Sequence, residues 1–383
     1  MKDWFQASLT YVREIVRLPV LGLVLAGLLA SPQAAHAAED APFISAANEA
    51  VDRIAREDGF SGVILMARGD EVLLRKAAGL ADREKGIAIT PETKFSLQSV
   101  TKQFTAAGVM LLVQDGKLSV DDLASKYYPG IPPIWRDITI KHLLTHSSGI
   151  ADFDSDDDLR FRTYEDAVTI AVGLPALFSP GARYEYNNAG YALLAAVIER
   201  VSGQRYGDFL RNRIFAPLGM RNTGYGAIPG DVIRGYMRSI AGEWQRGRSI
   251  DFDVLGGEGG IYSTLDDMLI WSNALARDQI LAPSSRNKMW TDYGYNYGFG
   301  WRFATKHGQR LIWHTGNFTE AGFAAIFDYF PDEALTVILM TNNTGLTNST
   351  ATLVIGGRET TFPANSARKV VEYVENLYFT GMP

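Results

Sequence analysis

Apolar runs of strand character stand at both ends of this chain, and their placement constrains the fold more than any other feature. Residues 63–67 and 72–77 are two such runs, and Gly69-Asp70 between them predicts a β-hairpin. Three more runs near the other end also predict strands: residues 311–313, 323–330 and 335–341. The economical arrangement is one antiparallel sheet to which both ends of the chain contribute.

The segment between these ends has a helical pattern that turn clusters interrupt, among them Ser179-Pro180-Gly181. Helical periodicity also marks residues 46–56 and the terminal stretch 367–377. The pattern predicts an α/β (α+β) protein, with an antiparallel sheet flanked by helices and an inserted all-helical domain. The predicted boundaries are an α/β domain at residues 38–103 and 290–383 and a mostly helical domain at residues 104–289.

Composition excludes several classes of function. The chain of 383 residues is 46% hydrophobic and 21% charged, as ordinary globular proteins are. Its net charge of -6 and its scattered basic residues argue against binding to nucleic acid or to anionic lipid. Because the chain contains no cysteine, a disulfide framework, a thiol nucleophile and a lipid-modified cysteine are all excluded. Stability must therefore come from the core.

The N-terminus has the pattern of a secretory signal peptide. Basic residues precede an apolar run at residues 18–30, and Ala35-His36-Ala37 is a small-x-small cleavage signature. A retained membrane anchor is the alternative, but the run is shorter than the ~20 apolar residues that span a bilayer. We therefore expect residues 1–37 to be a signal peptide, and the mature protein to be periplasmic or secreted without stable membrane insertion.

Ser99 and Lys102 are the first candidate catalytic residues. They open an apolar-periodic segment, so the serine is expected in the first turn of a helix, with the lysine amine beside its hydroxyl. A serine hydroxyl needs a base, and a partly buried lysine can serve as one. The same Ser-x-x-Lys pattern recurs at residues 285–288 and 366–369, and it is also the pattern of a capping serine followed by a surface lysine.

Two further motifs distinguish the first copy. Tyr186 and Asn188 supply a phenol and an amide two residues apart, although a tyrosine packed in a helical domain would give the same pattern. His314-Thr315-Gly316 follows an apolar strand and precedes Asn317. A glycine there lets a ligand approach the strand closely, and the next amide can donate to an oxyanion. The plainer interpretation is a turn glycine beside a core histidine.

In this order the three motifs resemble those of the serine β-lactamase and penicillin-recognising superfamily. That pattern is Ser-x-x-Lys, then Tyr-x-Asn or Ser-x-Asn, then Lys-Thr-Gly or His-x-Gly. Residues 138–149, 217–220 and 259–264 are also similar to segments of this superfamily, so the resemblance extends over nearly the whole mature chain. It implies an α/β sandwich joined to an all-helical domain, with the active site between them.

The resemblance also implies a role for each residue. Ser99 would be acylated, Lys102 and Tyr186 would share the role of general base, and Asn188 would orient the substrate. The backbone amides of Ser99 and Asn317 would form the oxyanion hole, beside the substrate-binding residues His314, Thr315 and Gly316. Many β-lactamases have a lysine in place of His314, and that lysine binds a substrate carboxylate, which a mostly neutral histidine would bind poorly.

We therefore expect an exported serine hydrolase that cleaves an amide or ester bond through an acyl-enzyme, without a cofactor. The His-x-Gly form resembles that of class C-like peptidases, D-aminopeptidases and esterases. The expected substrate is a small molecule or peptide that contains an amide, an ester or a β-lactam. Two alternatives remain open: a class C-like β-lactamase, which His314 disfavours, and a penicillin-binding sensor or scaffold that is acylated once without turnover.

Other chemistry is less well supported by the sequence. His142 and His146 have the spacing of two metal ligands on a helix, but no third ligand accompanies them, so we favour a structural role and expect no metal. The acidic run at residues 152–158 lacks the glycine and the distal glutamate of a calcium loop, which favours a solvated loop instead.

Overall fold

The computed structural model describes residues 32–153, 164–230, 233–239, 241–355 and 358–381. The apolar run of the predicted signal peptide lies outside these residues, as do most of the acidic positions between 152 and 158. The segment Ala41–Pro383 forms one compact unit. None of the helices in the described part of the chain has the length and apolar character that crossing a membrane requires.

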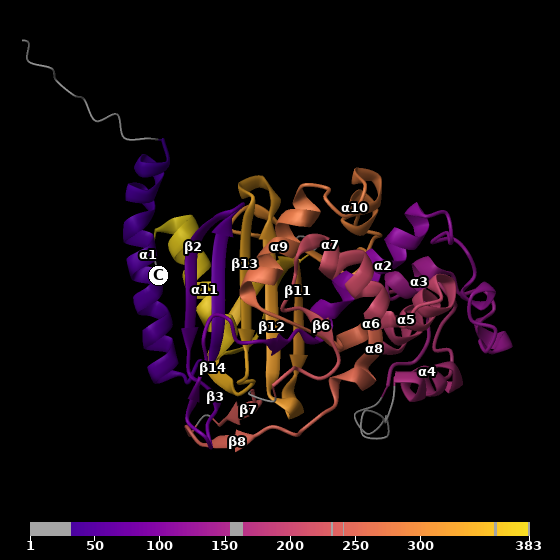
Figure 1. The fold of residues 1–383 in the computed structure, drawn as a ribbon, viewed down its shortest axis with the longest axis horizontal. Coiled ribbons are helices and arrows are strands. Elements are labelled where there is room, and N and C mark those ends of the chain that lie inside the picture. Colours follow the sequence, from indigo (N-terminus) through magenta and orange to yellow (C-terminus); the bar gives the residue numbers. More distant parts are fainter. Residues whose placement is uncertain (1–31, 154–163, 231–232, 240, 356–357, 382–383) are drawn as a thin grey trace, which may run out of the picture. The chain divides into compact units, whose positions relative to one another are not determined.

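An eight-stranded antiparallel sheet organises the structure, in the order β15-β14-β10-β11-β12-β13-β1-β2 (Figure 1). Its strands are β1 (Gly62–Arg68), β2 (Glu71–Ala78), β10 (Arg302–Lys306), β11 (Gln309–Phe318), β12 (Phe323–Phe330), β13 (Leu335–Thr341), β14 (Leu346–Ile355) and β15 (Arg358–Asn365). The β1–β2 pair is the predicted hairpin, and β1 pairs along its whole length with β13. The fold class predicted from the sequence is thus confirmed.

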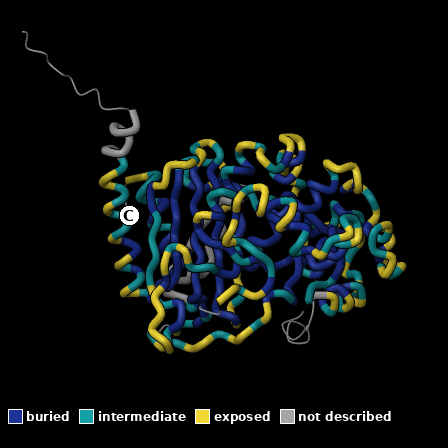
Figure 2. The backbone as a smooth tube through the Cα atoms, in the orientation of Figure 1, coloured by how far each residue is buried: buried dark blue, intermediate teal, exposed yellow. Residues whose placement is uncertain are grey.

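The central strands are buried on both faces because a separate core lies on each side of the sheet. Successive side chains of a strand point to opposite faces, and in β1 Val63 joins one core while Ile64 joins the other. The core around Ile64 is closed by residues of α1 (Pro32–Glu57) and α11 (Ser366–Thr380), such as Val51 and Val370. Figure 2 shows the resulting band of buried chain through the sheet.

The second core joins the sheet to a group of helices contributed by the middle of the chain (Figure 1). These helices are α2 (Thr101–Gln114), α3 (Ile140–Leu144), α4 (Tyr164–Gly173), α5 (Asn188–Ser202), α6 (Tyr206–Leu210), α7 (Ala216–Leu218), α8 (Gly256–Gly259), α9 (Leu265–Ala276) and α10 (Pro283–Met289). Short strands lie among and beside them: β3 (Leu80–Asp82), β4 (Ile87–Ala88), β5 (Phe95–Ser96), β6 (Gly224–Tyr225), β7 (Tyr236–Arg238), β8 (Trp244–Arg246) and β9 (Ile261–Ser263). The domain boundaries inferred from the sequence stay a prediction.

The structure differs from the sequence-based expectations in three respects. Ser99 lies in a 3₁₀ turn, Gln98–Val100, directly before α2 rather than within the first turn of that helix. His314 and Gly316 lie inside β11 rather than after it, because the strand continues to Phe318. Strands β10, β14 and β15 were not expected, since polar residues make up much of their sequences and only the end of β14, residues 353–355, is an apolar run.

Candidate active site

Ser99 and Lys102 meet where the chain passes from β5 into α2. Ser99 is partly exposed, whereas Lys102 is completely buried. The Lys102 amine donates hydrogen bonds to Ser99 Oγ at 3.1 Å, to Asn188 Oδ1 at 2.7 Å and to the backbone oxygen of Glu258 at 3.0 Å. All three acceptors are uncharged groups. The Lys102 amine is thereby held beside an accessible serine hydroxyl, within the distance that proton transfer between the two groups requires.

The Tyr-x-Asn motif approaches the same amine from the start of α5. Asn187 caps this helix by accepting the N–H of Gly190 at 2.6 Å, so Asn188 is its first residue. A second anchor is Asp152, whose Oδ1 accepts the N–H of Asn188 at 2.7 Å; burial raises the pKa of this carboxyl. The Tyr186 ring centroid lies 4.9 Å from Lys102 Nζ. Ser99, Asn188 and Tyr186 thus surround the Lys102 amine.

Strand β11 passes directly against the turn that contains Ser99, and Gly316 permits this contact. A Cβ atom at Gly316 would lie 2.2 Å from the backbone oxygen of Leu97 and 2.8 Å from the Ser99 nitrogen. Any side chain at this position would therefore push the strand away from the serine. Asn317 follows on the exposed side, and its amide side chain donates to Thr319 Oγ1 at 3.1 Å.

His314 is buried in the site and both of its ring nitrogens are engaged within the protein. Nδ1 lies 2.7 Å from the Thr315 carbonyl oxygen, so Nδ1 carries the proton, and Nε2 accepts from the Tyr297 hydroxyl at 3.0 Å. Burial, with the nearby charges of Arg302 and Lys102, holds the pKa of His314 well below its usual range. The imidazole is therefore neutral near pH 7, and it supports Tyr297 rather than presenting a positive charge to a ligand.

Arg302 supplies a cation that none of the sequence motifs contains. It opens β10, opposite Trp313 of β11, and is partly exposed. Its guanidinium carbon lies 5.1 Å from the ring centroid of Tyr186 and 5.6 Å from that of Tyr297. Burial raises the pKa of the neighbouring Tyr184 to about 12 although Arg302 opposes that shift. Arg302 could not be recognised as a site residue from the sequence, because it belongs to no motif and to no predicted strand.

The other two Ser-x-x-Lys copies do not form such a site. Ser285 is buried within α10. Ser366 is buried at the start of α11, and Lys369 donates to a carboxylate oxygen of Asp58 at 2.6 Å. Only Ser99, among the serines of these three copies, has its lysine within hydrogen-bond distance in the described structure.

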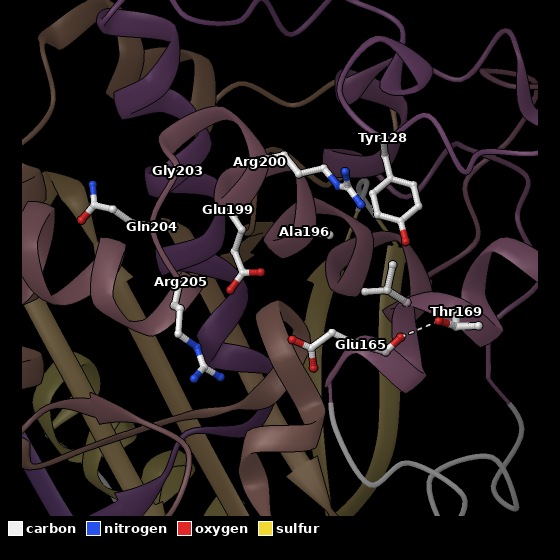
Figure 3. Close-up of a pocket in the computed structure, with 10 residues that line it drawn as sticks. Tyr128, Glu165, Thr169, Ala196, Glu199, Arg200, Gly203, Gln204 and Arg205 are labelled. Atoms are coloured by element: carbon white, nitrogen blue, oxygen red, sulfur yellow. Dashed lines mark hydrogen bonds between the residues drawn. The ribbon is translucent and has the colours of Figure 1, made fainter.

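A cavity of about 530 Å³ lies elsewhere, between α4 and α5 (Figure 3). Figure 3 shows the carboxylates of Glu165 and Glu199 and the guanidinium of Arg205 turned toward it. No residue of the three motifs lines this cavity. Within the described ranges no group of three or more His, Cys, Asp or Glu side chains has the arrangement of a metal site.

Comparison with known proteins agrees with this geometry. The family profile described as Beta-lactamase matches residues 47–355, which is most of the chain. The chain belongs to the beta-lactamase family. The membership predicted from the three ordered motifs is thus confirmed, and the chain is an enzyme of the β-lactamase-related serine hydrolases.

Three relatives illustrate the range of the family. A penicillin-binding protein from Bacillus halodurans is 28% identical and superposes with a TM-score of 0.68 over 76% of this chain and 94% of its own. Esterase EstB of Burkholderia gladioli is 34% identical over 216 residues, 49% of this chain and 53% of the esterase. The D-aminopeptidase of Brucella canis is 28% identical over 322 residues, 75% of this chain and 57% of the relative. The matches thus span little more than half the length of the two latter proteins.

Proposed function

We propose that this protein is an exported serine hydrolase that cleaves an amide or ester bond through an acyl-enzyme on Ser99. The observation that carries the proposal is the hydrogen bond of the buried Lys102 amine to Ser99 Oγ at 3.1 Å, made while the same amine holds Asn188. Similarity to an esterase and to a D-aminopeptidase supports this substrate range.

The proposed reaction has two steps. In acylation, the Ser99 hydroxyl gives its proton to the pair formed by Lys102 and Tyr186, and Oγ attacks the carbonyl carbon. The amides of Ser99 and Asn317 stabilise the oxyanion, and the leaving amine or alcohol departs with the proton. In deacylation, water loses its proton to the same pair and attacks the acyl carbon. The bond to Oγ then breaks, Oγ regains a proton, and the acid is released.

Arg302 narrows the substrate class within this proposal. Because His314 is neutral, the charge that an anionic substrate group would meet is that of Arg302, a partly exposed residue whose guanidinium lies beside Tyr186. An arginine fork binds a carboxylate in two parallel hydrogen bonds. We therefore favour substrates that carry a carboxylate close to the scissile bond, such as short peptides with a free C-terminus.

Similarity to a penicillin-binding protein motivates a second candidate, a protein that a β-lactam acylates without turnover. A class C-like β-lactamase is the third, and it would require steady hydrolysis of β-lactams. The neutral His314 disfavours it, unless Arg302 takes over the role of the lysine that is absent.

Substrate turnover tests these candidates. Wild type and Ser99→Ala are assayed with p-nitrophenyl esters, D-amino-acid p-nitroanilides and nitrocefin. We expect wild type to turn over an ester or an amide steadily, and we expect Ser99→Ala to lose this activity. A stoichiometric burst without further product would favour the binding protein, and rapid nitrocefin turnover would favour the β-lactamase. Turnover that survives Ser99→Ala would reject Ser99 as the nucleophile.

Export is the part of the proposal that rests on the N-terminal sequence alone. We propose cleavage after Ala37, followed by release into the periplasm or the medium. N-terminal sequencing of the protein expressed in a Gram-negative host tests this: a mature chain that begins at Ala38 in the periplasmic fraction supports it. An intact Met1 in the membrane fraction would indicate a retained anchor instead.

A further inference from the structure

His146 adopts a backbone conformation that non-glycine residues rarely adopt. It lies two residues after α3 ends at Leu144, with a φ of +55°, in the left-handed region. Its side chain is buried, with an exposed fraction of 1%. Strained residues that the surrounding structure holds in place cluster at functional sites. Its backbone oxygen also accepts the N–H of Glu185 at 2.8 Å, which ties it to the segment of the Tyr-x-Asn motif.

The His146 imidazole makes two contacts with the Tyr-x-Asn motif, one with its backbone and one with the Tyr186 ring. His146 Nδ1 accepts the backbone N–H of Asn187 at 3.0 Å. The ring centroid lies 4.3 Å from that of Tyr186 at an interplanar angle of 35° and 4.6 Å from that of Tyr297. One side chain therefore holds the backbone between Tyr186 and Asn188 and also packs against the phenol ring.

The protonation state of His146 follows from these contacts. Because Nδ1 accepts a hydrogen bond, the neutral ring carries its proton on Nε2, which is buried and has no partner among the described residues. Burial, with the nearby charges of Lys102 and Arg302, keeps the pKa of His146 well below its usual value. An unpaired buried donor destabilises a fold, so the compensating interactions are those that Nδ1 and the ring face make with the motif.

We propose that His146 is a positioning residue of the catalytic centre, which acts by holding Tyr186 and Asn188 against the Lys102 amine. This inference rests on the proposed function, because it assigns a role in Ser99 acylation. Asn188 Oδ1 lies 2.7 Å from Lys102 Nζ, and the Tyr186 ring is 4.9 Å from the same atom. A shift of the chain at Asn187 would move both groups, since it is the residue between them.

Two variants separate the two contacts. His146→Phe keeps an aromatic ring but loses the acceptor for the Asn187 N–H. His146→Asn keeps an acceptor oxygen at nearly the position of Nδ1 and tolerates a positive φ, but it loses the ring packed on Tyr186. His142→Asn is the matched control, because His142 is half-buried four residues earlier and its Nδ1 accepts a local backbone N–H, that of Thr139 at 3.2 Å.

The measurement is the rate constant for phosphonylation of Ser99 Oγ by a fluorophosphonate, with loss of fluoride, between pH 5 and 10, expressed per folded molecule. We expect both His146 variants to react about tenfold or more slowly than wild type, with a displaced pH profile, since small misplacements of catalytic groups are costly. His142→Asn should react at the wild-type rate. In a Tyr186→Phe background, His146→Asn should lower the labelling rate little further, because the ring of His146 acts largely through Tyr186.

Folded His146 variants with the wild-type rate and pH profile would overturn the inference. A loss in His146→Asn that is undiminished in the Tyr186→Phe background would overturn it too. If neither variant folds, His146 is a residue of the fold and the positioning role is rejected. Wild type that is not labelled on Ser99 would instead contradict the proposed function. Labelling that slows in Tyr186→Phe alone would leave the proposed function intact and remove only this inference.

Discussion

The Lys102 amine lies 3.1 Å from the Ser99 hydroxyl oxygen, and its side chain is completely buried while the serine is partly exposed. The relationship follows from the local chain geometry, because Ser99 in the 3₁₀ turn and Lys102 in the first turn of α2 are three residues apart, a spacing that places side chains on one face. The exposed hydroxyl is open to a substrate, and the amine that serves it is held by Asn188 and by the backbone at Glu258.

Lys102→Met tests this pair, because methionine fills a similar volume without an amine. We expect the rate at which a fluorophosphonate labels Ser99 to fall by about 10²–10⁴-fold, the range typical for loss of a general base. Thermal unfolding checks that the variant remains folded. Lys288→Met, at the exposed lysine of a second Ser-x-x-Lys copy, is the control and should react like wild type. Equal rates in wild type and Lys102→Met would exclude a role for this lysine in proton transfer.

Gly316→Ala tests the close approach of β11 to Ser99. The added Cβ would meet backbone atoms of Leu97 and Ser99, which cannot rotate away as a side chain can. β11 must therefore shift, and we expect fluorophosphonate labelling of Ser99 to slow by about 100-fold. The free energy of unfolding should fall by about 1–3 kcal/mol. Gly173→Ala is the control, because nothing lies within 4 Å of the added atom. Unchanged acylation in Gly316→Ala would mean that the strand does not contribute to the site.

Arg302→Gln tests the substrate class. Removing the guanidinium should lower kcat/KM about 10–100-fold for substrates with a carboxylate beside the scissile bond, the effect of losing a charge-assisted hydrogen bond. A neutral ester of the same acyl group should be affected little. Arg310→Gln, at an exposed position of β11, serves as the control. The same loss for the neutral ester would show that Arg302 supports the fold of the site rather than a carboxylate.

Glu375→Gln tests a buried ion pair far from the catalytic residues. Lys306 and Glu375 are both buried and form a salt bridge between β10 and α11. Removing one partner of such a pair should lower the free energy of unfolding by about 3–5 kcal/mol at pH 7. Lys306 retains Glu372 at 2.8 Å, which favours the lower end of this range.

The pH dependence of this loss has a defined sign. Burial alone would raise the pKa of Glu375, but Lys306, together with His307 and Arg368, outweighs burial and lowers this pKa from 4.5 to about 2. A carboxyl whose pKa is lower in the folded state stabilises the fold above its unfolded pKa, and the contribution is lost as the pH falls toward the folded value. The difference between wild type and Glu375→Gln should therefore be full above pH 5 and shrink toward pH 2. A difference that grows on acidification would contradict this assignment.

Sequence alone predicted those parts of the fold and site that local patterns determine. β12 and β13 were predicted at their observed ends because each is a mostly apolar run and turn residues separate the two. The Ser-x-x-Lys and Tyr-x-Asn motifs identified residues that the structure brings around Lys102, and the third motif identified Gly316, which lies against Ser99. Each motif could be recognised because it lies on one short segment of chain.

Arg302 and His146 could not be identified in this way, since their roles depend on tertiary contacts. Arg302 is a single charge at the start of a strand without an apolar run, and its neighbour Tyr186 is more than 100 residues away in the chain. His146 was noted as half of an unsupported metal pair and lies in the family-like segment 138–149, but it was not expected at the site, because its contact with Asn187 spans 41 residues. Ser99 was expected in the first turn of a helix but lies in the 3₁₀ turn before α2. The apolar spacing of the sequence does not distinguish a 3₁₀ turn from the start of an α-helix.

The most direct test of the central claim is intact-mass spectrometry of the protein after exposure to a fluorophosphonate. Wild type, Ser99→Ala and Ser285→Ala are measured side by side. We expect one adduct per molecule in wild type and in Ser285→Ala, and none in Ser99→Ala. No adduct on wild type, or an adduct that persists in Ser99→Ala, would contradict the assignment of Ser99 as the nucleophile.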